Sequence, residues 1–304
     1  MVLVEELDAL DLLIWLGNGA AVAQRLGCDQ STISRRSRQC QQVFGLRLLR
    51  RDAGWQANRT SSMLQLEREV HQLYRLRQGR QLRLDASLLA APLLGSPQPA
   101  GWIAGHLNRL GWRRPLQLLQ DRILDAWITA MGQELRQLEG RDVCTIPLAR
   151  TPLLLAGQRE HPLLRQGALQ LSDVCHMPRV APRQGRYPRT ERLLGDDWRS
   201  QSPAQVMEEL NTGHRPQARA TERGDQDPSG SLILHYGTAF SLAHQHSLQP
   251  LPLDLGVSTE LTLVVRRDLV EQPSVCLLIH DLRQRLQAAC HTGTLADGGL
   301  ICLN

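Results

Sequence analysis

The sequence predicts an α/β protein with a small helical N-terminal part and a larger C-terminal part that alternates strands with helices. Apolar residues recur at helical spacing through the first 80 residues, whereas short apolar runs alternate with helical stretches from Leu82 onward. A chain of 304 residues with 42% hydrophobic residues is long enough for two or three folding units. A disordered or fibrous protein is therefore excluded.

The N-terminal part begins with two expected helices. The apolar spacing predicts an amphipathic helix over residues 5–16. Gly17-Asn18-Gly19 ends this helix, and the Asn18 side chain is expected to cap a second helix over residues 20–26.

A third helix is expected from Gln30 to about Phe44, after Gly27 and with Asp29 as its N-cap. Two short helices joined by a tight Gly turn form a helix-turn-helix unit. The small core between them is expected to contain Val22, Leu26, Cys28, Ile33 and Cys40. The outward face of the third helix is expected to present Gln30, Ser31, Thr32, Ser34, Arg35 and Arg38. Such side chains can reach base edges and phosphates in the major groove of DNA.

Residues 45–59 are expected to form a two-stranded wing that turns at Asp52-Ala53-Gly54. Arg47, Arg51 and Arg59 lie at the base and rim of this wing, where they are candidates to bind the DNA backbone.

A long fourth helix is expected next, with Thr60 as its cap. In this helix Met63, Leu66, Val70, Leu73 and Arg77 follow a heptad-like spacing and form one stripe. One such stripe needs a partner helix, so we expect homodimerisation through residues 61–79.

Charge agrees with a polyanionic partner. All 35 basic residues are Arg, and residues 20–60 hold 8 Arg against 2 acidic residues. The absence of Lys excludes the Walker A phosphate loop and enzymes that need a Schiff-base amine. A solvated Arg-rich face in a protein that avoids Lys explains the charge equally well, so the helical pattern has to decide between the two.

Two other kinds of site have only partial sequence signals. Residues 12–26 contain Gly-x-Gly and resemble a dinucleotide-binding turn, but Val22 occupies the third glycine position. The seven cysteines include no Cys-x-x-Cys pair, and the Cys and His residues from Cys276 to Cys302 share no known ligand spacing. No cofactor, metal or catalytic site is expected, and an enzyme is the least favoured interpretation.

The segment VAQRLGCDQSTISRRSRQCQQVFGLRLLRR resembles the DNA-binding segment of LysR-type transcriptional regulators. Ile33-Ser34-Arg35 matches the Leu-Ser-Arg triplet of that family's recognition helix, and residues 45–49 match the element that enters its wing. The resemblance implies a sequence-specific, DNA-binding regulator of transcription that acts as a homodimer or homotetramer on double-stranded DNA.

Three positions depart from the family pattern. Gly19 replaces an aromatic residue, Ser37 replaces a core Ile, and residues 60–63 replace Thr-Glu-Ala-Gly. A buried Ser hydroxyl destabilises a small core if it has no hydrogen-bond partner. The alternative hypothesis is therefore a small-molecule sensor or interaction protein with a degenerate DNA-binding head.

The C-terminal part is expected to alternate strands and helices around a parallel sheet. The expected strands are 82–88, 116–120, 124–129, 151–156, 231–236 and 260–266, and the expected helices are 99–110, 133–139, 202–211 and 273–289. The family resemblance implies two lobes, like those of periplasmic binding proteins, that enclose a small effector. Ser87 and Ser96 are candidates to bind that effector.

The expected domains are a DNA-binding domain over 1–60, a linker helix over 61–81 and an effector-binding-like domain over 82–304, with a second lobe over about 157–258. The start of the chain is acidic rather than basic, and no apolar run approaches about 20 residues, the length a membrane span needs. A cytoplasmic protein with no membrane partner is expected.

Overall fold

The computed structural model describes most of the N-terminal half of the chain and parts of the rest. The described residues are 2–51, 54–59, 61–87, 90, 97–105, 112–131, 135, 142–158, 161–174, 179–182, 198–201, 232–236, 248–291 and 301–303. Among them, no helix combines the length and apolar character that crossing a membrane requires.

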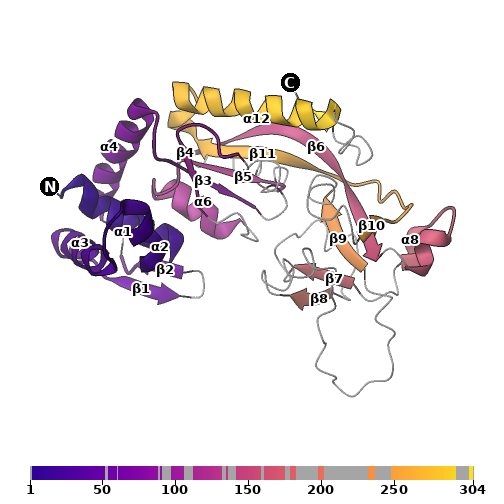
Figure 1. Cartoon of the computed structure of the whole chain (residues 1–304), viewed down its shortest axis with the longest axis horizontal. Helices are drawn as coiled ribbons and strands as arrows, with labels where there is room; N and C mark the ends of the chain where they lie inside the picture. Colours follow the sequence, from indigo (N-terminus) through magenta and orange to yellow (C-terminus); the bar gives the residue numbers. More distant parts are fainter. Residues whose placement is uncertain are drawn as a thin grey trace, which may run out of the picture.

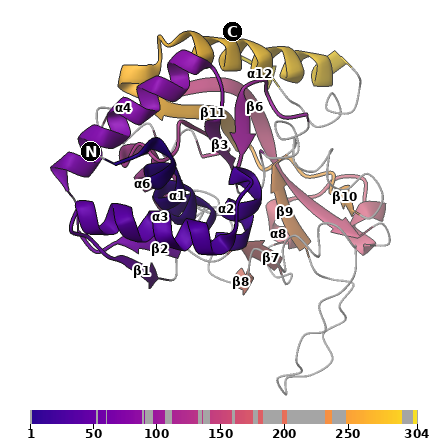
Figure 2. The same cartoon turned by 60° about the vertical axis from the view of Figure 1, so that its left-hand side comes forward.

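The N-terminal head has the predicted helix-turn-helix and wing (Figures 1 and 2). Its elements are α1 (Val4–Leu16), α2 (Gly19–Leu26), α3 (Gln30–Val43), β1 (Leu48–Arg51) and β2 (Gly54–Ala57). A dinucleotide-binding turn needs a strand before its glycines, but the residues before Gly17 belong to the helix α1. The dinucleotide-binding interpretation is therefore wrong. The long helix α4 (Ser62–Gln78) follows the wing.

Local signals explain these boundaries. The Asn18 side chain accepts a hydrogen bond from the Ala20 amide, as expected, and Gly27 ends α2 in the left-handed conformation with φ 62°. Two expected caps differ. Asp29 stands at the N-cap of α3 but makes no side-chain cap, and the Ser61 hydroxyl, not Thr60, accepts from the Leu64 amide to begin α4. Thr60 lies outside the described residues.

The C-terminal part is built on a mixed sheet whose main strand order is β4-β3-β5-β11-β6-β9-β7-β8. These strands are β3 (Leu82–Ala86), β4 (Trp102–Ala104), β5 (Ala126–Thr129), β6 (Val143–Gln158), β7 (Arg179–Pro182), β8 (Trp198–Gln201), β9 (Leu232–Tyr236) and β11 (Ser258–Arg266). Two further strands, β10 (Leu248–Pro250) and β12 (Ile301–Cys302), pair with β6. The parallel sheet expected from the sequence is found at both ends, but β11 and β6 run antiparallel in the middle.

The long strand β6 explains why the middle of the sheet is antiparallel. Its first part, residues 143–152, pairs with β11, and its last part, residues 153–158, pairs with β9 and β10. One strand therefore carries the chain from a first group of strands, β3, β4, β5 and β11, into a second group, β7, β8 and β9. Strand β11 returns the chain in the opposite direction.

Two helices cover the two faces of the first group of strands (Figure 1). Ile128 and Leu263 face α12 (Pro273–His291), whereas Trp127 and Val264 point to the other face, where α6 (Arg113–Gln120) lies. This alternation is the period of two that a strand imposes on its side chains. The head packs on the α6 face, so α1, α2 and α3 share one apolar core with α6 and the sheet.

Most of the elements expected for the C-terminal part are confirmed. The structure has strands at 82–86, 126–129, 143–158, 232–236 and 258–266, and a helix at 273–291. The expected strand over 116–120 is wrong, because its apolar residues belong to α6. The expected helix over 99–110 is wrong at β4, the helix over 133–139 is described only at Leu135, and residues 202–211 lie outside the described part.

A buried ion cluster joins the head, α4 and the sheet. Arg68 of α4 lies 2.7 Å from Asp11 of α1, and Arg83 of β3 lies 2.7 Å from Asp8 of α1. Arg75 of α4 makes two hydrogen bonds to Asp125, at 2.9 and 3.3 Å. Each of the three arginines thus has a carboxylate partner, which removing a charge from water requires.

Arg68→Met tests this cluster. The change leaves Asp11 buried with only Arg83, 3.8 Å away, as an ion partner among the described residues, so the free energy of unfolding is expected to fall by about 3–5 kcal/mol. The double variant Arg68→Met/Asp11→Leu should recover most of that loss in urea titrations. The exposed Arg80→Met is the control, with a change within about 0.5 kcal/mol. Equal losses for the single and double variants would contradict this account.

Candidate nucleic-acid interface

The helix α3, expected from the sequence to be a recognition helix, buries one face and exposes the other. Ile33, Ser37 and Cys40 point into the head at the spacing i, i+4, i+7. Of the side chains expected to face DNA, Thr32 is half-buried. The others are exposed, namely Gln30, Ser31, Ser34, Arg35 and Arg38. The Ser34 hydroxyl donates to the Gln30 carbonyl at 3.1 Å, which leaves its lone pairs as acceptors for a DNA donor.

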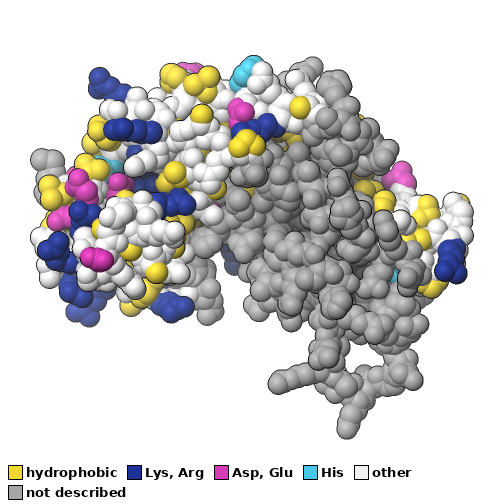
Figure 3. Space-filling view, in the orientation of Figure 1, with side chains coloured by type: hydrophobic (Ala, Val, Ile, Leu, Met, Phe, Trp, Pro, Cys, Tyr) yellow, Lys and Arg dark blue, Asp and Glu magenta, His cyan; other side chains and the backbone are white. Residues whose placement is uncertain are grey.

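Arginines on this face have no acidic partner within the described residues. Arg35 and Arg38 belong to a helix that contains no Asp or Glu, and neither forms an ion pair with a described residue. Basic side chains gather on the side of the molecule that the head occupies, at the left of Figure 3. These guanidinium groups are therefore available to phosphate or to guanine edges.

The wing continues the basic surface. Strands β1 and β2 pair antiparallel with Arg50 opposite Trp55 and Arg51 opposite Gly54. Arg47, Arg51 and Arg59 are exposed at the positions expected for them.

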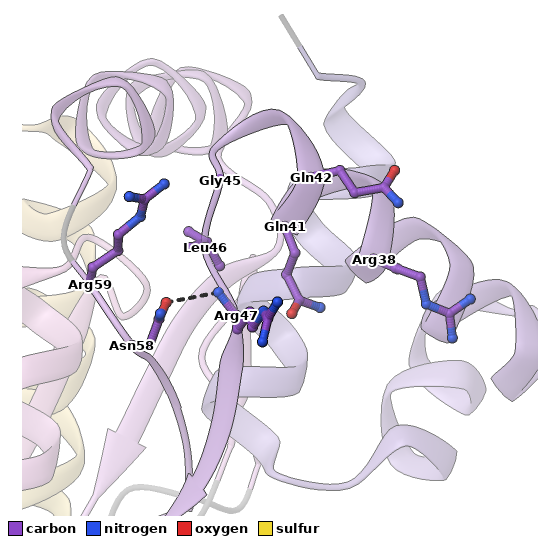
Figure 4. Close-up of a pocket in the computed structure, with 8 residues that line it drawn as sticks. All are labelled: Arg38, Gln41, Gln42, Gly45, Leu46, Arg47, Asn58 and Arg59. Carbon is purple, nitrogen blue, oxygen red and sulfur yellow. Dashed lines mark hydrogen bonds between the residues drawn. The ribbon is translucent and has the colours of Figure 1, made fainter.

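A groove of about 490 Å³ lies between the end of α3 and the base of the wing (Figure 4). It is lined by Arg38, Gln41, Gln42, Gly45, Leu46, Arg47, Asn58 and Arg59. The guanidinium of Arg59 packs where a Cβ on Gly45 would be, and Gly45 has φ 59°. Only glycine satisfies both conditions, so this residue lets the arginine approach the recognition helix.

Two polar side chains that the sequence pattern does not single out fix the groove. The Asn58 carboxamide oxygen accepts from the Arg47 amide at 2.8 Å. The Gln41 carboxamide oxygen accepts from the next amide, that of Leu48, at 2.9 Å. Successive amides at the entrance of the wing are thus held from two sides, which fixes the backbone that carries Arg47. The only sequence signal is the position of Gln41 four residues after Ser37, on the same face of α3.

Gln41 also gives a hydrogen-bond partner to Ser37, the residue that replaces a core Ile of the family pattern. The Ser37 hydroxyl is buried, and the Gln41 side-chain NH₂ donates to it and to the Ser37 carbonyl, both at 3.3 Å. The polar residue in the core therefore has a partner, and the loss of the Ile costs less than an unsatisfied hydroxyl would. At a second departure, Gly19, the Gln30 side chain of α3 occupies the neighbouring space, because a Cβ on Gly19 would lie 3.1 and 3.3 Å from its atoms.

A second groove, of about 620 Å³, lies on the other side of Arg38 and Gln41. Its lining includes Asn18, Gly19, Gln30, Ser34, Arg50 and Trp55. The outer half of α3 therefore stands between two hollows, a shape that leaves its side chains accessible.

Burial shifts the pKa values of two side chains of the head. Burial raises the pKa of the Cys40 thiol to about 12, so this cysteine stays neutral inside α3. Burial lowers the pKa of Arg25, whose guanidinium donates to the Ala104 carbonyl of β4 at 2.9 Å and lies 5.7 Å from the Trp15 ring. Arg25 is thus part of the head's contact with the sheet.

The stripe of α4 is exposed as expected. The exposed fractions of Met63, Leu66 and Val70 are 63%, 64% and 63%. The opposite face of the same helix buries polar residues, among them Arg68 and Arg75. The inward face of this helix is thus mostly polar, with Leu64 and Leu76 as its buried apolar residues, while a row of apolar side chains faces solvent, which is unusual for a surface helix.

The His and Cys residues among those described are placed in structural surroundings. The described residues contain no group of three or more His, Cys, Asp or Glu side chains arranged to hold a metal ion. His161 is buried, and its Nδ1 accepts from the Leu163 amide at 3.3 Å. The Sγ atoms of Cys290 and Cys302 lie 3.3 Å apart as thiols, and burial raises the pKa of Cys302 to about 11.

Known proteins resemble this chain in sequence and in fold. No family model matches the chain. A probable nitrogen assimilation transcriptional activator of Synechococcus elongatus is 26% identical over 200 residues, which are 60% of this chain and 64% of that protein. The chain thus spans just under two thirds of the length of this curated relative.

Two solved structures match nearly the whole chain. A full-length OxyR variant from Pseudomonas aeruginosa has a TM-score of 0.56 at 14% identity, over 93% of this chain and 95% of that one. An H₂O₂-bound OxyR mutant of Corynebacterium glutamicum has a TM-score of 0.52 at 14% identity, over 100% and 99%. OxyR proteins are LysR-family regulators. The chain has the LysR-type fold. The resemblance seen in the sequence is confirmed at this level, and the matched proteins are transcriptional regulators rather than enzymes.

Of the two residues that are candidates to bind an effector, the structure describes only Ser87. Ser87 follows β3 at the end of the strand and is 3% exposed, and its amide donates to the Ile128 carbonyl of β5 at 2.8 Å. Its hydroxyl has no hydrogen-bond partner among the described residues. Ser96 lies outside the described residues.

Gln41→Leu tests the link between α3 and the wing. The change leaves the Leu48 amide and the Ser37 hydroxyl without their partner, so the free energy of unfolding is expected to fall by about 1–3 kcal/mol in urea titrations. Gln42→Leu, at the exposed neighbouring position, is the control and should change it by less than about 0.5 kcal/mol. If both variants are equally stable, Gln41 does not hold the wing.

Proposed function

We propose that this protein is a sequence-specific, DNA-binding transcriptional regulator of LysR type. The observation that carries the proposal is the exposed face of α3, where Arg35 and Arg38 meet no acidic residue of the described part and hydroxyl and amide groups precede them. Helix α3 enters the major groove, and the wing follows the adjacent backbone through Arg47, Arg51 and Arg59. The protein works in the cytoplasm, where its DNA is.

The protein acts as a homodimer or a dimer of dimers paired through α4. The apolar stripe of Met63, Leu66, Val70 and Leu73 is solvent-exposed in one chain, and a second copy would cover it. Pairing of the two α4 helices sets the distance between two recognition helices, and thus the spacing of the half-sites on DNA.

The remaining assignments complete the proposal. The DNA-binding domain spans 1–60, the linker helix 61–81 and the effector-binding-like domain 82–304, with a second lobe over about 157–258. The end of α4 and the start of β3 support the boundary between the second and third of these. A small effector binds near Ser87 and Ser96, and the buried hydroxyl of Ser87 at a strand end supports this placement.

Arg35→Ala/Arg38→Ala tests the function. A duplex is first selected from a random-sequence DNA library with the wild-type protein. The variant should bind that duplex at least about 10-fold more weakly, and the slope of log affinity against log salt should flatten by about one unit for each phosphate that the variant no longer neutralises. Fluorescence anisotropy titrations at several salt concentrations measure both.

The control for this experiment is Arg165→Ala/Arg267→Ala, which removes the same charge from exposed positions outside the head. If the two double variants reduce the affinity equally, net charge and not α3 binds DNA. If the wild type selects no sequence and heparin retains it no better than its net charge explains, the sensor with a degenerate head is the correct interpretation.

Leu66→Glu/Val70→Glu tests the dimer. Two carboxylates in an apolar helix–helix seam are costly to bury, so the variant should sediment as a monomer at concentrations where the wild type is a dimer or larger. Gln65→Glu places a charge on an exposed position of α4 beside the stripe and should leave the assembly unchanged. A wild-type monomer in analytical ultracentrifugation would exclude pairing through α4.

A further inference from the structure

The head and the first group of strands meet through specific contacts as well as an apolar core. The Trp15 indole NH of α1 donates to the Asp85 carboxylate of β3 at 2.9 Å. A Cβ on Gly105 would collide with both the Trp15 ring and this carboxylate, so a glycine after β4 makes room for the head. The head is therefore seated in a fixed place on the sheet.

Arg114 extends this contact to the wing. It lies in α6, near the start of the helix, and its Nη2 donates to the Ile14 carbonyl of α1 at 2.8 Å and to the Trp55 carbonyl of β2 at 2.7 Å. One guanidinium from the C-terminal domain thus holds a helix and the wing of the head together. The planar fork of an arginine suits two acceptors in fixed directions.

Trp55 and Ala57 of the wing pack against the apolar core that the head shares with α6, but this packing is incomplete on one side. A cavity of about 170 Å³ lies beside the contact, between the base of the wing, the start of α4 and α6. Its lining includes Gln56, Asn58, Arg59, Ser61, Arg114 and Asp121. On the side where this space remains, the hydrogen bond of Arg114 to Trp55 bridges the wing to α6. Burial raises the pKa of Asp121 in the same cavity, while Arg68 and Arg114 lower it.

The held strand carries the basic part of the wing. Trp55 pairs with Arg50 across the hairpin, and the next pair contains Arg51. A displacement of the Trp55 carbonyl therefore moves the backbone of both arginines.

We propose that Arg114 is a positioning residue that couples the effector-binding-like domain to the wing of the DNA-binding head. Movement of α6 is transmitted through the Trp55 carbonyl to Arg50 and Arg51, without passing through α4. The state of the C-terminal domain thereby sets how the wing meets the DNA backbone. This inference rests on the proposed function for its consequence, but not for the contact itself.

The experiment compares Arg114→Met with Arg113→Met in the full-length protein. Arg113 is the exposed neighbour, whose guanidinium lies 5.7 Å from the Trp112 ring, so the control removes the same charge from the same helix. Hydrogen exchange of residues 54–57 is measured without DNA. Arg114→Met should exchange at least about 5-fold faster there than the wild type, because opening of the wing no longer breaks the hydrogen bond to Trp55, and Arg113→Met should match the wild type. Arg114→Lys, which keeps the charge and can reach one carbonyl, should lie between them.

DNA binding gives the second measurement, on the duplex selected by the wild type. Arg114→Met should bind several-fold more weakly with an unchanged salt slope, because Arg114 contacts the wing and not a phosphate. Equal exchange of residues 54–57 in both Met variants would overturn the proposal, as would a slope reduced by about one unit, which marks direct phosphate binding by Arg114. Faster exchange that spreads through β3 and β5 would also overturn it, since it indicates general destabilisation. A wild type that selects no DNA rejects the proposed function, while the exchange data still decide the coupling.

Discussion

The structure depends on a balanced set of buried charges between the head, α4 and the sheet. Asp8, Asp11 and Asp125 face Arg68, Arg75 and Arg83, so three negative charges meet three positive ones. Asp125 also accepts from the Arg83 amide at 2.8 Å and from the Gln72 side chain at 2.9 Å, which leaves few of its lone pairs unused. Buried ion pairs add little net stability because desolvation opposes the attraction, but they penalise every arrangement that separates the partners. Their main effect here is to specify one seat for the head.

This arrangement explains the mostly polar inward face of α4. Arg68, Gln72 and Arg75 are directed inward because their partners lie in α1 and at Asp125, both within the same chain. Leu64 and Leu76 are buried in the same chain, whereas Met63, Leu66, Val70 and Leu73 are left on the outside, where the hydrophobic effect favours the proposed second copy. Directional contacts and two buried leucines fix the helix within its own chain, and its exposed apolar stripe is available for the proposed pairing.

Signals close together in the sequence made the head predictable, whereas contacts between distant segments did not. The Asn18 cap, the Gly27 terminator and the exposed side of α3 follow from residues within a few positions of one another. The contact of Trp15 with Asp85 spans 70 positions, and that of Arg83 with Asp8 spans 75. No periodicity or motif carries such pairings. In α6, the apolar run at 116–120 has the composition of a buried strand as well as of a helix, and its burial between the head and the sheet decides for the helix.

Contacts between distant segments also change how the positive charge of the sequence is interpreted. Arg25 belongs to the basic segment at 20–60, yet its guanidinium donates to the Ala104 carbonyl of the sheet. Arg83 and Arg114 likewise donate to backbone carbonyls. An arginine fork can serve several acceptors at once, which an ammonium group does less well. In a chain without Lys, some arginines therefore join backbone carbonyls within the protein, and the count of positive charges alone does not identify a partner. The proposed DNA contact rests on the exposed arginines of α3 and the wing, which have no ion partner among the described residues.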